Sequence, residues 1–282
     1  MPDGFRVGLF IGRKKQAGVR EVFFMNKYPM LILDAAKLKN NASETVKRCR
    51  EKGVSVCGVI KGCDGDLDVA RIMVDSGVSQ LGSSRLYHLS ELKRVGCKLP
   101  LMLIRTPAPS EAYETVKYSD ISLNTEKETL ILLNKACKEQ YKTHSVVIMA
   151  ELGDLREGVW DKKELCDLCL FVEKELPYLK LSGIGTNMGC YGSVVPTVAK
   201  MKELLSLARD VESVIGRKLE LISGGATNAF PLVCSGQMPE GVNHLRIGEN
   251  VLTARDLRNY SVWKALIFFL SICLPCARKY PN

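Results

Sequence analysis

From residue 54 onward the sequence contains eight short apolar runs, and each of the first seven is followed by a stretch with helical periodicity. The apolar runs contain few polar residues, which is typical of strands that are covered on both faces, as in a parallel sheet. The predicted strands span residues 54–61, 78–82, 99–104, 121–123, 146–152, 179–186, 219–223 and 242–247. Eight strands that alternate with helices within about 200 residues predict an α/β fold, a closed (β/α)8 TIM barrel.

An open, doubly wound sheet is the other fold that is built from this alternation. Such sheets normally have fewer strands, and no G-x-G-x-x-G motif follows the first strand of this chain.

The starts of two helices are predicted from their N-cap residues. Asp34 is the predicted N-cap of a helix that ends near Lys52, and Thr125 is the predicted N-cap of the helix after the fourth strand.

The alternation is confined to residues 28–252, which we assign to the barrel domain. Residues 1–27 form an N-terminal extension, and residues 253–282 form an atypical C-terminal tail. Within the tail, residues 265–274 are apolar except for one serine, but this stretch is too short for a membrane-spanning helix, which needs ~20 residues. We expect a helix packed on the barrel there, and no membrane partner.

The formal net charge of +9 raises the question of nucleic-acid binding. Residues 1–28 carry six Lys or Arg and two Asp or Glu, and residues 252–282 carry five and one, so each end contributes +4. The remaining +1 belongs to residues 29–251, whose charges nearly balance. Because nucleic-acid-binding domains carry a clustered basic patch, we expect no nucleic-acid partner.

The 11 cysteines are scattered and odd in number, in a chain long enough to bury a core without disulfides. Most of them, such as Cys57 and Cys137, lie in apolar patterns, so we expect reduced thiols and a cytoplasmic location. The C-x-x-C pairs at 166–169 and 273–276 have zinc-ligand spacing, but they are far apart and the first lies in a helical pattern. We predict no metal site.

Lys61 ends the first predicted barrel strand. A lysine is rarely buried without a partner, and the C-terminal ends of barrel strands are where catalytic residues lie. A lysine at that place can lose its proton and form a Schiff base with a carbonyl group. A strand-end lysine that simply extends into solvent is the alternative that position alone leaves open.

Two glycine-rich turns follow the last two strands, S-G-G-A-T-N at 223–228 and R-I-G-E at 246–249. Loops at these places in barrels commonly bind phosphate through backbone N–H groups. Ordinary tight turns would also explain the glycines. A phosphate site opposite a Schiff-base lysine, however, describes a binding site for pyridoxal 5′-phosphate (PLP).

Several separated motifs resemble the PLP-dependent alanine racemase family, and most of all its ornithine/alanine racemase branch. The resemblance covers residues 28–252. The motifs occur in matching order: G-V-I-K at 58–61, E-L-G-D-L-R-E-G-V at 151–159, G-I-G-T-N at 183–187, C-Y-G at 190–192, I-S-G-G at 222–225 and N-H-L-R-I-G-E at 243–249.

The resemblance implies a PLP-binding barrel in which Lys61 carries the cofactor covalently and is one of two acid/base groups. It implies that Arg246 faces the pyridine nitrogen, that Asn187 lies near the ring, and that Arg156 lies beside the phenolic oxygen and the lysine. Burial beside Arg156 would lower the pKa of Lys61. The remaining cofactor-binding residues that it implies are the phosphate-binding group Thr227, Gly248 and Glu249, with Ser223 and Gly224 beside it.

The implied function is racemisation of a small or basic amino acid such as ornithine, alanine or serine. A protonated arginine at the ring nitrogen keeps that nitrogen unprotonated, which weakens the cofactor as an electron sink and favours simple removal and return of the Cα proton. Racemases of this type continue into a β-rich domain that supplies a tyrosine to the partner subunit, and no segment here matches that domain. A homodimer is therefore a weaker expectation, and a single-domain PLP-binding protein without racemase activity is the alternative.

Overall fold

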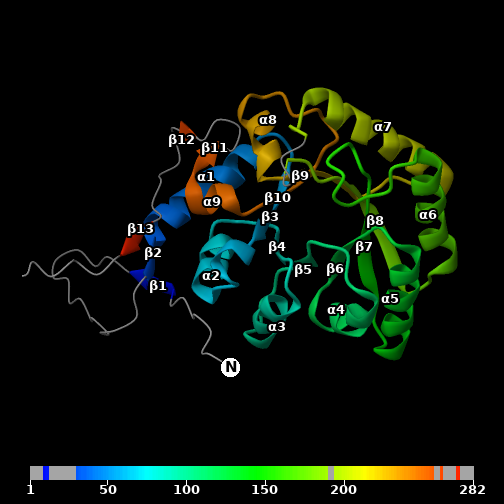
Figure 1. The fold of residues 1–282 in the computed structure, drawn as a ribbon, viewed down its shortest axis with the longest axis horizontal. Helices are drawn as coiled ribbons and strands as arrows, with labels where there is room; N and C mark the ends of the chain where they lie inside the picture. The colour runs from blue at the N-terminus through cyan, green and yellow to red at the C-terminus, as the bar shows by residue number, and fades with distance from the viewer. Residues whose placement is uncertain (1–8, 13–29, 190–193, 257–260, 263–270, 274–282) are drawn as a thin grey trace, which may run out of the picture.

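The computed structural model describes residues 9–12, 30–189, 194–256, 261–262 and 271–273. Eight parallel strands close into a barrel in which β10 pairs with β3, as Figure 1 shows nearly end-on. In barrel order the strands are β3 (Ser55–Val59), β4 (Gln80–Ser83), β5 (Leu101–Leu103), β6 (Ile121–Asn124), β7 (His144–Met149), β8 (Leu179–Gly185), β9 (Leu221–Ala226) and β10 (His244–Ile247). The predicted (β/α)8 barrel is confirmed.

Helices surround the barrel strands in Figure 1. They are α1 (Ala35–Arg50), α2 (Leu67–Asp75), α3 (Leu86–Arg94), α4 (Ala112–Tyr118), α5 (Lys127–Glu139), α6 (Lys162–Glu175), α7 (Val198–Ile215), α8 (Phe230–Cys234) and α9 (Glu249–Thr253). Three short 3-10 helices lie in the connections, η1 (Lys61–Cys63), η2 (Pro109–Glu111) and η3 (Thr227–Ala229).

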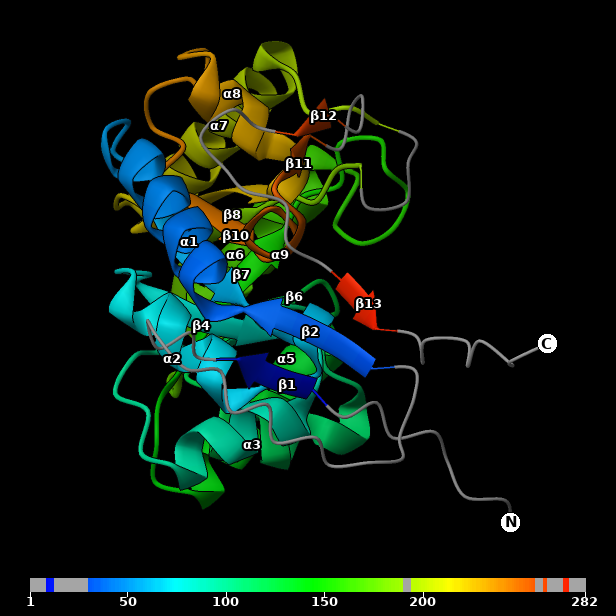
Figure 2. The ribbon, with the colours of Figure 1, turned by 90° about the vertical axis from the view of Figure 1, so that its left-hand side faces the viewer.

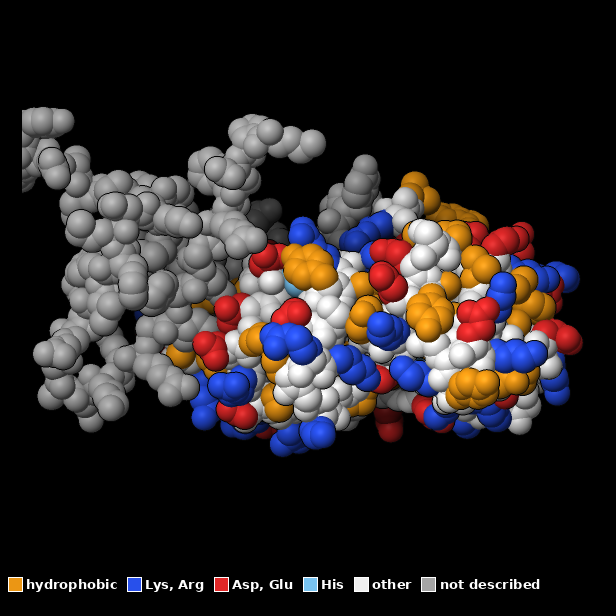
Figure 3. All heavy atoms as spheres, turned by 90° about the horizontal axis from the view of Figure 1, so that it is seen from below, with side chains coloured by type: hydrophobic (Ala, Val, Ile, Leu, Met, Phe, Trp, Pro, Cys, Tyr) orange, Lys and Arg blue, Asp and Glu red, His pale blue; other side chains and the backbone are white. Residues whose placement is uncertain are grey.

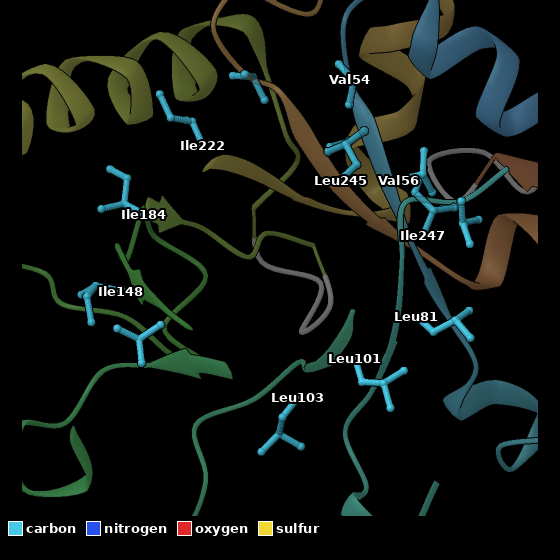
Figure 4. Packing of buried hydrophobic residues seen from close by; sticks show 14 of the residues in the cluster. Val54, Val56, Leu81, Leu101, Leu103, Ile148, Ile184, Ile222, Leu245 and Ile247 are labelled. Carbon is cyan, nitrogen blue, oxygen red and sulfur yellow. The ribbon is translucent and has the colours of Figure 1, made fainter. Parts of the chain in front are cut away.

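The strand residues divide between two cores. On β7, Val146 and Ile148 belong to the large cluster between strands and helices, whereas Val147 and Met149 belong to a smaller cluster inside the barrel. This division follows from the alternation of side chains along a strand. Figure 4 shows residues of the outer cluster, including Leu81, Ile148 and Ile184 on different strands. Both faces of the sheet are buried, as the apolar runs predict.

The helix caps test the local sequence signals. Asp34 caps α1 as predicted, because its Oδ1 accepts hydrogen bonds from Ala36 N at 3.0 Å and Lys37 N at 3.2 Å. The predicted cap at Thr125 is wrong, since α5 begins at Lys127 and its N-cap residue is Glu126. The Thr125 hydroxyl instead lies 3.4 Å from the hydroxyl of Thr106. The cap signal was therefore misplaced by one residue.

A small sheet lies outside the barrel, beside the start of α1 (Figure 2). Its strand β2 (Met30–Asp34) pairs with β1 (Leu9–Gly12) in parallel and with β13 (Ser271–Cys273) in antiparallel orientation. The helix predicted for 265–274 is therefore wrong at 271–273, and residues 265–270 and 274 lie outside the described ranges. A second antiparallel pair joins β11 (Arg255–Asp256) and β12 (Ser261–Val262).

No helix in the described part of the chain is long and apolar enough to cross a membrane. On the face seen in Figure 3, basic and acidic side chains are interspersed. This distribution agrees with the near balance of charges in residues 29–251.

Candidate active site

The loops that carry most of the predicted site residues follow four consecutive barrel strands, β8, β9, β10 and β3. His244 on β10 pairs with Ser223 on β9, and Ile247 on β10 pairs with Gly58 on β3. Because parallel strands end on the same side of a barrel, the segments 186–189, 223–228, 246–249 and 60–66 meet at one face. This face is the candidate active site.

The last turn approaches the first barrel strand so closely that only glycine fits. A Cβ at Gly248 would lie 2.5 Å from Val59 O and 2.9 Å from Val59 Cβ. Gly62 is similarly close to Leu252, where a Cβ would lie 2.9 Å from Cδ1. The turn after β10 and the segment that begins at Lys61 are therefore in direct contact.

Arg246 is buried inside the barrel and bound at two points. Its Nη1 donates to Ser223 Oγ at 2.5 Å, and its Nη2 donates to the carbonyl oxygen of Thr186 at 2.8 Å. Ser223 Oγ also lies 2.7 Å from His244 Nδ1. Because a guanidinium group only donates, the serine oxygen accepts from Arg246.

His244 is uncharged in this arrangement. Burial, together with the charge of Arg246, lowers the pKa of His244 to about 3. The result is one buried positive charge, on Arg246, held by a hydroxyl and a carbonyl oxygen.

The loops after β7 and β8 are bound to each other. Asn187 Nδ2 donates to Glu157 Oε1 at 2.9 Å, and the N–H of Gly189 donates to Asp154 Oδ1 at 3.0 Å. The carboxylate of Glu151 closes the first loop, because it accepts from the N–H groups of Gly153 at 2.6 Å and Arg156 at 3.2 Å. These bonds fix the backbone on the β7–β8 side of the face.

Lys61 lies just beyond the strand that was predicted to contain it. The strand β3 ends at Val59, Ile60 has φ −99° and ψ 3°, and Lys61 begins η1. Because the chain leaves the extended conformation there, Lys61 projects beyond the packed layers and is exposed, as is Arg156. The expected burial of Lys61 beside Arg156 is therefore wrong for this structure.

The turn predicted to begin at residue 223 begins later, because β9 continues to Ala226 and contains both Gly224 and Gly225. These two glycines have different surroundings. A Cβ at Gly224 would lie 2.6 Å from Val242 Cγ1 and 3.2 Å from Met201 Sδ, so this residue packs toward the outer core and offers only its backbone. Gly225 has φ +115°, and the atoms closest to a Cβ there would be Thr186 O at 3.8 Å and Ala229 Cβ at 4.0 Å. Both are ordinary van der Waals distances.

The structure thus brings eight of the nine predicted residues to the ends of adjacent strands, and Arg156 follows the neighbouring strand β7. Thr227 is buried at the start of η3, and Glu249 is exposed. The C-Y-G motif at 190–192 lies outside the described residues. The sequence interpretation missed His244 and Glu157. The position of His244 two residues before Arg246 on one strand was a usable signal, since such residues share a face.

The sequence model of the family described as "Alanine racemase, N-terminal domain" matches residues 33–255. Two similar proteins are an ornithine racemase from Acetoanaerobium sticklandii, 35% identical over 229 residues, and a lysine racemase from Thermotoga maritima, 33% identical over 235 residues. The matches cover 81% and 83% of this chain, and 64% and 65% of the relatives. The chain thus spans just under two thirds of the length of these two racemases.

Solved structures show the same fold at low sequence identity. D-threo-3-hydroxyaspartate dehydratase from Delftia sp. HT23 has a TM-score of 0.71 at 18% identity, covering 88% of this chain and 67% of that one. Alanine racemase from Clostridium difficile 630 has a TM-score of 0.69 at 20% identity, covering 84% and 64%. PipY from Synechococcus elongatus has a TM-score of 0.59 at 16% identity, covering 74% and 99%.

The family match spans the whole barrel, from the end of β2 to the first residue of β11, and the racemase relatives align over more than four fifths of the chain. The chain belongs to the alanine racemase N-terminal-domain family.

Proposed function

We propose that this barrel holds PLP on Lys61 and interconverts the enantiomers of an amino acid. The observation that carries the proposal is that an exposed lysine follows β3 while a buried, serine-bound arginine lies on β10, the strand paired with β3. The ornithine and lysine racemase relatives support the same reaction class. They favour a basic amino acid as the substrate, ahead of alanine or serine.

PLP is the cofactor of this family. The residues at the face fit such a group. The buried Thr186 hydroxyl at the end of β8 has no hydrogen-bond partner within the described ranges. A phosphate or phenolic oxygen of the cofactor would accept a hydrogen bond from this hydroxyl. Thr227, Gly248 and Glu249 would surround the phosphate, Asn187 would lie near the ring, and Arg156 would lie beside Lys61.

When bound, this cofactor withdraws electrons from the Cα atom of an attached amino acid and makes its Cα proton acidic. Once the amino group of the substrate has replaced Lys61 on the cofactor, the released Nζ would take up that proton on one face, and a second acid/base group on the opposite face would have to return a proton to give the other enantiomer. Arg246 stays protonated, and its fixed guanidinium leaves the ring nitrogen as a hydrogen-bond acceptor. Ser223 and Thr186 hold the guanidinium in that position.

The alternative is a PLP-binding barrel that does not racemise amino acids. It is favoured by one observation, the fit to PipY, whose chain is covered to 99% by the barrel alone. Both functions require PLP at the same lysine. They differ only in whether an amino acid is turned over.

Two measurements test the proposal. The purified protein mixed with PLP should acquire the yellow absorbance of a lysine-bound cofactor, and Lys61→Ala should not. L-ornithine, L-lysine, L-alanine and L-serine are then incubated with the PLP-loaded protein and followed by chiral chromatography. We expect the D enantiomer of at least one of them to form, and none with Lys61→Ala. A yellow protein that leaves all four unchanged would support the PLP-binding alternative.

A further inference from the structure

A buried histidine lies behind the loop that carries Lys61. His88, on the first turn of α3, has a side chain that is 1% exposed. Its Nδ1 lies 2.7 Å from the hydroxyl of Ser83 at the end of β4, and its Nε2 lies 3.2 Å from Asp64 Oδ1. The imidazole therefore bridges one barrel strand and the segment between β3 and α2.

The direction of the hydrogen bonds in this bridge follows from its ends. Ser83 Oγ accepts from the N–H of Arg85 at 3.2 Å, and its own proton is then directed to His88 Nδ1. The proton on Nε2 is directed to the carboxylate of Asp64. Burial lowers the pKa of His88, and hydrogen bonds from Tyr87 and His88 lower the pKa of Asp64. At neutral pH the chain is Ser–OH, neutral imidazole and carboxylate.

A Ser–His–Asp chain raises the question of a nucleophilic serine. Such a mechanism needs a serine hydroxyl that a substrate can reach. Ser83 is fully buried, and its oxygen is already bound by the histidine and by a backbone N–H. The chain is therefore a structural support, and the question is what it supports.

Asp64 connects this support to Lys61. Its N–H donates to the carbonyl oxygen of Lys61 at 3.3 Å, and the N–H of Gly65 donates to that of Ile60 at 3.1 Å. Asp64 also has φ +51°, the left-handed region that a non-glycine residue adopts only when its surroundings hold it there. Asp64 is thus bound by His88 through its side chain, and its backbone N–H closes the turn that begins at Lys61.

Contact with the ring reinforces the hydrogen bond. A Cβ at Gly65 would lie 2.4 Å from His88 Cδ2, so the imidazole packs directly on the backbone of this turn. At the other end, the N–H of Ile60 continues the barrel ladder by donating to Gly82 O at 3.0 Å. The segment 60–65 is therefore held to β4 at both ends. Ile60 binds Gly82 directly, and Asp64 is linked to Ser83 through His88.

We propose that His88 and Asp64 are positioning residues for Lys61, which set the place of its amine at the rim of the barrel through the turn 60–65. The inference rests on the proposed function of Lys61. It adds two residues that lie outside the motifs identified in the sequence.

Two substitutions of His88 separate its two hydrogen bonds. The amide nitrogen of Gln reaches the position of imidazole Nε2, so His88→Gln keeps the donor to Asp64. The shorter amide of Asn reaches the position of Nδ1, so His88→Asn keeps the contact with Ser83 and loses the bond to Asp64. Both variants remove the same ring from the same buried site, and each serves as the control for the other.

The first readout is the rate at which PLP is captured by Lys61, followed by absorbance after mixing. We expect His88→Gln to stay within about threefold of the wild-type rate and His88→Asn to fall by roughly tenfold to a hundredfold, because a small displacement of a reacting group costs that much. Their midpoints of urea unfolding should be similar. Equal capture rates in the two variants, or rates that simply follow stability, would overturn the proposal.

The second readout does not need the cofactor. Hydrogen exchange of the amides of Asp64 and Gly65 reports how firmly the turn is closed. We expect faster exchange at these amides in His88→Asn than in His88→Gln, and equal exchange in the two would overturn the proposal. If the wild-type protein captured no PLP, the proposed function would fail, and the exchange result would still decide whether His88 holds the turn.

Discussion

The position of Arg246 at the candidate site can be predicted from the sequence, but its hydrogen-bond partners cannot. The rule that strand ends meet at one face of a barrel identified it, together with Lys61 and the 223–228 turn. The partners of Arg246 depend on the register between strands: Ser223 lies opposite His244 only because β9 and β10 pair at that position. Nothing local in the sequence specifies that register, and the pairing of Asn187 with Glu157 likewise depends on two long loops.

Ser223→Ala tests the support of Arg246. The substitution removes an acceptor from a buried guanidinium and the hydrogen-bond partner of His244 Nδ1, and leaving buried polar groups unpaired costs about 1–3 kcal/mol. We expect the free energy of unfolding in urea to fall by that amount. The matched control is Ser55→Ala, since the hydroxyl of Ser55 is bound to Asn243 O at an exposed site and its loss should cost about 0.5 kcal/mol or less. Equal effects of the two would contradict this account of Arg246.

Among the elements, the eight barrel strands were predicted because each is covered on both faces and reads as an apolar run. Two predictions about elements failed for identifiable reasons. The apolar residues of the stretch 265–274 show no periodicity that distinguishes a helix from a strand, and residues 271–273 form β13. The first barrel strand stops two residues before Lys61 because Ile60 leaves the extended conformation. The position of Lys61 is therefore set by the turn that follows.

Gly183→Ala tests the contact between neighbouring strands. A Cβ at this residue of β8 would lie 1.7 Å from the carbonyl oxygen of Leu221 on β9. Neither backbone can move away without breaking the barrel ladder, so we expect a loss of more than about 4 kcal/mol in the free energy of unfolding, or no folded protein. Gly216→Ala, at the C-cap of α7 with φ +76° and open space around it, is the control and should cost about 1 kcal/mol. Similar losses at the two sites would contradict the packing described for β8 and β9.

At the scale of the whole molecule, buried histidines make the fold sensitive to acid. Burial lowers the pKa of His144 to about 4, and burial with the charge of Arg246 lowers that of His244 to about 3. The unfolded chain binds these protons near pH 6.5 and the folded chain does not. The free energy of unfolding is therefore highest above pH 6.5 and falls as the pH drops toward the folded-state values.

His144→Gln measures this effect for one residue. Between pH 6 and pH 4 we expect the wild-type free energy of unfolding to fall more steeply than that of His144→Gln, by about 1.4 kcal/mol per pH unit for the one proton removed. Urea denaturation at several pH values gives both slopes. Identical slopes would mean that His144 does not titrate differently in the folded and unfolded chains.

The central claim is that Lys61 carries PLP at the rim of this barrel. Its most direct test is borohydride reduction of the PLP-treated protein, followed by proteolysis and mass spectrometry of the peptides. We predict one phosphopyridoxyl group, on the peptide that contains Lys61, and no labelled peptide from Lys61→Ala. Label on another lysine, or undiminished labelling in Lys61→Ala, would contradict the account.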